Sequence, residues 1–222
     1  MKNAFKLICF CLLLSIFNQA CAQEATPFQQ DIDAFKQQDK LHPPPQQAIV
    51  FVGSSSFTKW TDVQQYFPGY TIINRGFGGS SLPDVIHFAA DIIYPYHPKQ
   101  VVIYCGDNDF AGNENLPAET VVERVKELFK QIRQHLPKAT ITYISIKPSP
   151  SRARFMPKIE TANKAIKEFL ANYTNTGFID VYHAMLRPDG KPIPAIFLSD
   201  SLHMNSKGYV IWKKAIEPAL KK

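Results

Sequence analysis

Four groups of residues in this sequence have side chains or backbone turns suited to nucleophilic chemistry. Three consecutive serines stand at 54–56, and Asp200 precedes His203 by three positions. The other two groups are the glycine-rich stretch NRGFGGSS at 74–81 and the short stretch GDND at 106–109. We ask which reaction would need these residue types together.

Hydrolysis of an ester needs all of them. A serine hydroxyl is a weak nucleophile that requires a base within hydrogen-bond reach, and histidine is suited to this because its pKa lies near neutral. A carboxylate holds the imidazole in the right tautomer, and backbone N–H groups or an asparagine amide stabilise the oxyanion. Taken singly, the serines are also typical of a helix cap or a phosphate-binding loop.

The rest of the chain indicates how these groups are positioned. Short runs rich in Val, Ile and Tyr alternate with longer segments of helical periodicity, of which 117–136 is the clearest. This alternation predicts an α/β fold, a three-layer α/β/α sandwich with a flavodoxin-like parallel sheet of about five strands. The runs are 48–52, 70–74, 100–105, 140–146 and 177–181. Ligands bind beyond the carboxyl ends of such strands, where the candidate residues stand.

The N-terminus has the pattern of a secretory signal peptide. A basic start and an apolar run of eleven residues lead to Ala-Cys-Ala at 20–22. We therefore expect residues 1–22 to be removed, residues 23–222 to form a single domain, and the protein to be periplasmic or extracellular without stable membrane insertion. The alternative is a lipoprotein anchored at Cys21, which Asn18 disfavours because a leucine is expected there.

Composition excludes several other classes. Cys105 is the one cysteine outside the predicted leader, so no internal disulfide is expected, and removal of Lys2 and Lys6 lowers the net charge from +6 to +4. No arginine–aromatic motif suggests nucleic-acid binding, and no histidine or cysteine spacing suggests a metal site. We expect no cofactor, and the sequence leaves the oligomeric state open.

Four blocks of the sequence resemble those of the SGNH hydrolases, also called GDSL-like lipases and acylhydrolases. Residues 51–60, FVGSSSFTKW, resemble the nucleophile block, and 74–84, NRGFGGSSLPD, the glycine block. Residues 104–109, YCGDND, and 200–209, DSLHMNSKGY, resemble the Gly-x-Asn-Asp and Asp-x-x-His blocks. The resemblance covers nearly all of 23–222 and implies the fold of that family.

The resemblance also implies a role for individual residues. The nucleophile would be Ser55, the base His203 and the orienting acid Asp200. The oxyanion donors would be the Ser55 N–H, the Gly79 N–H and the Asn108 side chain, with Gly79 preferred to its neighbour because it lies five residues after the asparagine that opens its block. Ser54 departs from the family, which has an aspartate there, and Ser56 is expected to cap the next helix.

Further residues at the edge of the predicted sheet where the strands end are candidates for contact with substrate. These are Arg75, Phe77, Asp107, Lys147 and Arg152. The basic side chains could meet an anionic or sugar-bearing substrate, or could stand in a solvated connection. Phe77 could line an acyl or sugar surface or pack in the core, and Asp109 is expected to brace its loop.

The function that these expectations support is a secreted serine esterase working through an acyl-enzyme on Ser55. Its substrates would be small-molecule or glycan esters, above all short-chain acyl or O-acetyl esters of carbohydrates. The alternatives are a lysophospholipase or thioesterase, and a non-catalytic module that binds a glycan or a phosphate ligand such as flavin mononucleotide.

Overall fold

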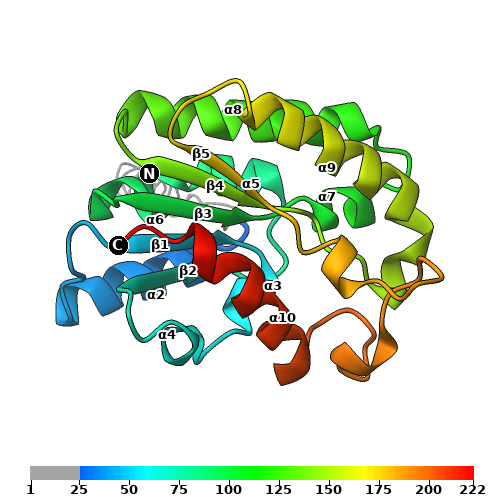
Figure 1. Ribbon diagram of the computed structural model, residues 1–222. Coiled ribbons are helices and arrows are strands. Elements are labelled where there is room, and N and C mark those ends of the chain that lie inside the picture. Colours follow the sequence, from blue (N-terminus) through cyan, green and yellow to red (C-terminus); the bar gives the residue numbers. More distant parts are fainter. Residues whose placement is uncertain (1–25) are drawn as a thin grey trace, which may run out of the picture.

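The computed structural model describes residues 26–222, and a five-stranded parallel sheet lies at its centre (Figure 1). The strand order is β2-β1-β3-β4-β5, and every neighbouring pair is parallel. The strands are β1 Ile49–Gly53, β2 Ile72–Gly76, β3 Gln100–Tyr104, β4 Thr140–Ile144 and β5 Thr176–Ile179. The predicted leader and its cleavage site lie outside the described residues.

Helices connect the strands and cover both faces of the sheet. The α-helices are α2 Gln29–Leu41, α3 Ser55–Thr58, α4 Val63–Tyr66, α5 Leu82–His87, α6 Ala89–Ile92, α7 Asp107–Gly112, α8 Ala118–His135, α9 Met156–Leu170 and α10 Ser206–Ile216. Short 3-10 helices are η1 Tyr94–Tyr96, η2 Pro150–Phe155, η3 His183–Met185, η4 Pro194–Ile196 and η5 Glu217–Ala219. Figure 1 shows α10 on one side of the sheet and α8 and α9 on the other.

Alternation along the strands divides the core into two clusters. In β1, Val50 and Val52 belong to one cluster, together with residues of α2, α5, α6, α8 and α9. Ile49 and Phe51 belong to the other cluster, with residues of α3, α4 and α10. All five residues of β1, β3 and β4 are buried, as strands covered on both faces require. The predicted three-layer α/β/α architecture is therefore confirmed.

The carboxyl end of β1 fixes where the serines begin. Gly53 has a φ of +139°, and a β-carbon there would lie 1.8 Å from the carbonyl oxygen of Tyr104 on β3. Only glycine allows this close approach. The Gly53 carbonyl accepts from the Phe77 N–H at 2.9 Å, and the Ser54 N–H donates to the Tyr104 carbonyl at 3.1 Å. The ends of β1, β2 and β3 are thereby held together.

Candidate active site

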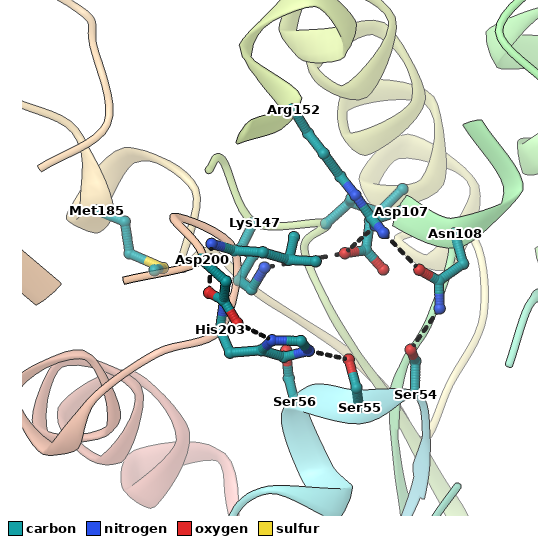
Figure 2. A network of polar contacts seen from close by, with 12 residues as sticks. Ser54, Ser55, Ser56, Asp107, Asn108, Lys147, Arg152, Met185, Asp200 and His203 are labelled. Atoms are coloured by element: carbon teal, nitrogen blue, oxygen red, sulfur yellow. Dashed lines mark hydrogen bonds and ion pairs between the residues drawn. The ribbon is translucent and has the colours of Figure 1, made fainter. Parts of the chain in front are cut away.

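Ser55 is the first residue of α3, directly after β1. Its hydroxyl faces His203, which lies in the loop before α10 (Figure 2). The expectation that Ser56 caps this helix is wrong, because Ser54 occupies the N-cap position and makes no side-chain capping bond. The Ser54 hydroxyl instead contacts Asn108. The strand-to-helix turn thus directs adjacent hydroxyls at different partners.

A chain of hydrogen bonds joins Ser55, His203 and Asp200. The distance from His203 Nε2 to Ser55 Oγ is 3.0 Å, and that from His203 Nδ1 to Asp200 Oδ2 is 2.6 Å. A carboxylate only accepts, so Nδ1 carries the proton and Nε2 of the neutral ring offers its lone pair to the serine hydroxyl. This geometry suits removal of the hydroxyl proton by the imidazole.

Asp200 is fixed by a tight turn. Its Oδ1 accepts the backbone N–H groups of Leu202 and His203, each at 2.9 Å. Ser201 within this turn has a left-handed φ of 57°. The hydrogen bond from the His203 ring, followed by the two backbone N–H groups, holds the pKa of Asp200 well below its usual range. The carboxylate is therefore ionised at neutral pH and stabilises a protonated His203.

Asn108 lies beside the nucleophile turn, in the first turn of α7. Its Nδ2 donates to Ser54 Oγ at 2.7 Å and to the Ser80 carbonyl at 2.9 Å. Both amide hydrogens therefore have acceptors within the protein. A substrate oxygen held by this amide must share one of them, and the rotatable Ser54 hydroxyl yields more easily than a backbone carbonyl.

The glycine-rich loop between β2 and α5 passes close to the serine turn. A β-carbon on Gly78 would come within 4.0 Å of Ser55 Cβ. Gly79 has a φ of +89°, and a β-carbon there would lie 3.7 Å from the ring of Phe28. The loop is thus adjacent to Ser55, and the role of Gly79 as an oxyanion donor stays a prediction.

Asp109 braces this loop, as the sequence predicts. Its Oδ2 accepts the Leu82 N–H at the start of α5 at 3.0 Å, and its Oδ1 pairs with Arg124 of α8 at 2.6 Å. Burial raises the pKa of Asp109, and the Leu82 N–H and Arg124 act against that rise. Asp109 therefore fixes the glycine loop to α7 and α8.

Three of the predicted substrate-contact residues, two of them buried, form one cluster next to Asn108. Asp107 Oδ2 lies 2.7 Å from Arg152 Nη1 and 3.8 Å from Lys147 Nζ, and Arg152 Nη2 donates to Asn108 Oδ1 at 2.8 Å (Figure 2). The Lys147 side chain is 1% exposed, and burial lowers its pKa. These side chains lie near Ser55 but are engaged with one another.

Arg75 and Phe77 do not lie where a substrate contact was expected. The Arg75 guanidinium is buried, pairs with Asp39 of α2 and donates from Nε to Tyr96 Oη at 2.6 Å. Phe77 is fully buried and packs edge-on against Phe28 at 5.3 Å between ring centroids. The Arg75 side chain holds α2 against β2, which corrects the substrate contact expected for it. Phe77 packs in the core, the second of the two possibilities that the sequence left open.

The contacts of Asn108 with Ser54 and Arg152 could not be predicted from the sequence. Ser54 and Asn108 are 54 positions apart, and Asn108 and Arg152 are 44 positions apart. The rule that ligands bind beyond the carboxyl ends of parallel strands placed these residues at the same edge of the sheet. It could not say which of them contact each other.

Among residues 26–222, no cluster of three or more metal-ligating side chains occurs. In the same part of the chain, no helix is both long enough and apolar enough to cross a membrane.

A protein-family model matches most of this chain. The model of the GDSL-like Lipase/Acylhydrolase family matches residues 50–211, which include all four blocks. No curated protein matches the chain.

Several solved structures share the fold. A Streptococcus pneumonia protein described as a platelet activating factor is 19% identical, with a TM-score of 0.76 and full coverage of both chains. A Bacteroides fragilis protein described as an acylhydrolase is 22% identical over 84% of this chain and 94% of its own, with a TM-score of 0.73. An acetylxylan esterase from Geobacillus stearothermophilus is 16% identical over 79% of this chain and 94% of its own, with a TM-score of 0.62.

The family model matches residues 50–211, which is well over half of the chain. The protein therefore belongs to the GDSL-like lipase/acylhydrolase family.

Proposed function

We propose that this protein is a serine esterase that hydrolyses carboxylic esters through an acyl-enzyme on Ser55. The observation that carries the proposal is the continuous hydrogen-bonded chain from Ser55 through His203 to Asp200. Membership of an acylhydrolase family supports the same reaction class.

The reaction has two halves. Ser55 Oγ attacks the ester carbonyl while its proton passes to His203 Nε2, and Asp200 stabilises the imidazolium. The oxyanion is held by the Ser55 and Gly79 N–H groups and the Asn108 amide. As the tetrahedral intermediate collapses, the alcohol leaves with the proton from His203. A water molecule then attacks the acyl-enzyme, gives its proton to His203 and releases the acid, and Ser55 regains its proton.

The substrates that we propose are short-chain acyl esters, including O-acetyl groups on carbohydrates. Support comes from the acetylxylan esterase among the proteins that share this fold. We also propose that the protein is exported after cleavage of residues 1–22, on the strength of the leader pattern alone. N-terminal sequencing of the exported protein tests this, since cleavage predicts a chain that starts at Gln23, whereas a lipid-modified Cys21 would contradict it.

The substrate proposal is tested by hydrolysis of a small panel. Purified protein would be assayed on 4-nitrophenyl acetate, 4-nitrophenyl octanoate and acetylated xylan, with Ser55→Ala as the inactive control. We expect turnover of the acetate ester and release of acetate from xylan, both lost in Ser55→Ala. Turnover of the octanoate alone would overturn the carbohydrate proposal, and equal rates for wild type and Ser55→Ala would overturn the esterase.

A further inference from the structure

The orientation of the Asn108 carboxamide is set by two groups of opposite character. On one side the Ser80 carbonyl, which can only accept, takes a hydrogen bond from Nδ2 at 2.9 Å. On the other side Arg152, which can only donate, gives one to Oδ1 at 2.8 Å. A flip of the carboxamide would set carbonyl against carbonyl and amine against guanidinium. The two partners therefore allow a single orientation.

Arg152 is itself held firmly. Its Nη1 lies 2.7 Å from Asp107 Oδ2, and the side chains of Arg152 and Asp107 are 14% and 8% exposed. Lys147 adds a second positive charge 3.8 Å from the same carboxylate oxygen. Because Asp107 directly precedes Asn108 in α7, a single guanidinium bridges two consecutive side chains of this helix (Figure 2).

The segment that carries Arg152 also touches the turn of the catalytic acid. The Ser151 N–H donates to the Ser201 carbonyl at 3.1 Å, and Ser201 directly follows Asp200. The η2 segment thus connects the asparagine with the loop of Asp200 and His203. An arginine in this segment can fix the orientation of the Asn108 side chain without contacting substrate.

We propose that Arg152 is a positioning residue that holds the Asn108 amide hydrogens toward the oxyanion, with Asp107, which also pairs with Lys147, fixing the guanidinium. The proposal rests on the proposed function, in which Asn108 is an oxyanion donor. Without Arg152, the Ser80 carbonyl alone opposes a flip of the carboxamide, so that for part of the time its oxygen faces the developing negative charge. Arg152 therefore acts on the rate of the chemical step rather than on the binding of ester.

Steady-state kinetics of Arg152→Ala on 4-nitrophenyl acetate provide the first test. Removal of one oxyanion donor costs about 10²–10³ in kcat, so loss of its positioning is expected to lower kcat by roughly tenfold or more with KM nearly unchanged. In the double variant Arg152→Ala/Asn108→Ala, the arginine substitution should have little further effect. A raised KM with unchanged kcat, or losses that multiply in the double variant, would overturn the proposal.

Arg154→Ala is the matched control. Arg154 lies in the same segment but pairs with the exposed Glu114 at 2.5 Å and has no bond to Asn108. This variant should keep the wild-type kcat. An equal loss in Arg154→Ala and Arg152→Ala would overturn the proposal, because it would reflect general disturbance of the segment. Arg152→Lys, which keeps the charge but not the forked pair of donors, should keep the fold without restoring kcat.

A readout that does not depend on hydrolysis separates this proposal from the proposed function. In ¹H–¹⁵N spectra of the full protein, the Asn108 carboxamide should give two distinct, slowly exchanging signals. These signals should move and exchange faster with solvent in Arg152→Ala and keep their wild-type positions in Arg154→Ala. Unchanged signals in Arg152→Ala would overturn the positioning role even if the wild type hydrolysed esters, and the expected change would support it even if it did not.

Discussion

His203 Nε2 lies 3.0 Å from Ser55 Oγ, although the two residues are 148 positions apart in the sequence. The contact joins the carboxyl end of β1 to the loop that precedes α10. The Trp212 indole of α10 and Phe57 of α3 pack edge-on at 6.0 Å between ring centroids, on the same face of the sheet. The Tyr209 hydroxyl of α10 also donates to the Ser56 carbonyl of α3 at 2.9 Å, so two contacts join the helices that follow the nucleophile and the base.

Asp200→Asn tests the role of the carboxylate. The amide would lose the negative charge that stabilises the imidazolium and would favour the wrong tautomer of His203, so kcat should fall by about 10³–10⁴. The measurement is kcat on 4-nitrophenyl acetate at neutral pH, with circular dichroism to check the fold. A loss of less than about tenfold would show that His203 is oriented by other groups.

The lowered pKa of Asp200 also predicts a pH dependence of stability. The unfolded chain takes up the proton near an ordinary aspartate pKa of about 4, whereas the folded protein does so only at lower pH. The stabilisation from the ionised carboxylate is thus complete above about pH 4 and is lost as the pH falls toward the folded pKa. The difference in urea midpoint between wild type and Asp200→Asn should be larger at about pH 6 than at about pH 3. An equal difference at both would contradict this.

Ser54→Ala tests the contact that replaces the family aspartate. The variant leaves one Asn108 amide hydrogen without its acceptor in a buried site, which should cost about 1–3 kcal/mol in the free energy of unfolding. Its kcat should fall far less than that of Asn108→Ala, because the amide itself remains. Urea denaturation and kinetics of both variants make the comparison. Equal kinetic losses would mean that Ser54 is as important to the oxyanion site as Asn108.

Alanine substitutions of the two loop glycines test which one serves the oxyanion. Gly79 has a φ of +89°, which side-chain-bearing residues rarely adopt, so Gly79→Ala should shift the loop and lower kcat strongly. Gly78 has no positive φ, and a β-carbon there meets only ordinary contacts at 3.9–4.0 Å, so Gly78→Ala should be mild. A greater kinetic loss in Gly78→Ala would move the predicted donor by one residue.

Arg75→Met tests the corrected role of this arginine. Removal of one partner of the partly buried pair with Asp39 should lower the free energy of unfolding by about 1–3 kcal/mol. KM for 4-nitrophenyl acetate should stay the same, because the side chain packs under α2. Urea denaturation and Michaelis kinetics give the two quantities. An unchanged stability with a raised KM would restore the substrate role expected from the sequence.

Features encoded locally could be predicted from the sequence. Continuous apolar runs such as 48–52 identified the strands, and the stripe within 117–136 identified α8, Ala118–His135. The Asp200–His203 pair is also local, since a spacing of three closes a single turn. The positions of Asn108 and Arg152 after two parallel strands predicted that both lie at the same edge of the sheet.

Features that depend on long-range packing could not be predicted. The contact of Arg75 with Asp39 requires α2 to lie against β2, and no periodicity in either segment encodes that docking. An arginine near the end of a strand carries the same signal whether it faces a ligand or, as Arg75 does from within β2, a carboxylate on a neighbouring helix. The bonds from Asn108 to Ser54 and Arg152 likewise depend on three loops converging.

The central claim is that Ser55 is the nucleophile, and covalent labelling tests it most directly. The protein would be treated with a fluorophosphonate, and the modified peptide would be mapped by mass spectrometry, with Ser55→Ala and Ser56→Ala in parallel. We predict one adduct, on Ser55, which is retained in Ser56→Ala and absent from Ser55→Ala. An adduct on Ser54 or Ser56, or no adduct on the wild-type protein, would contradict the account.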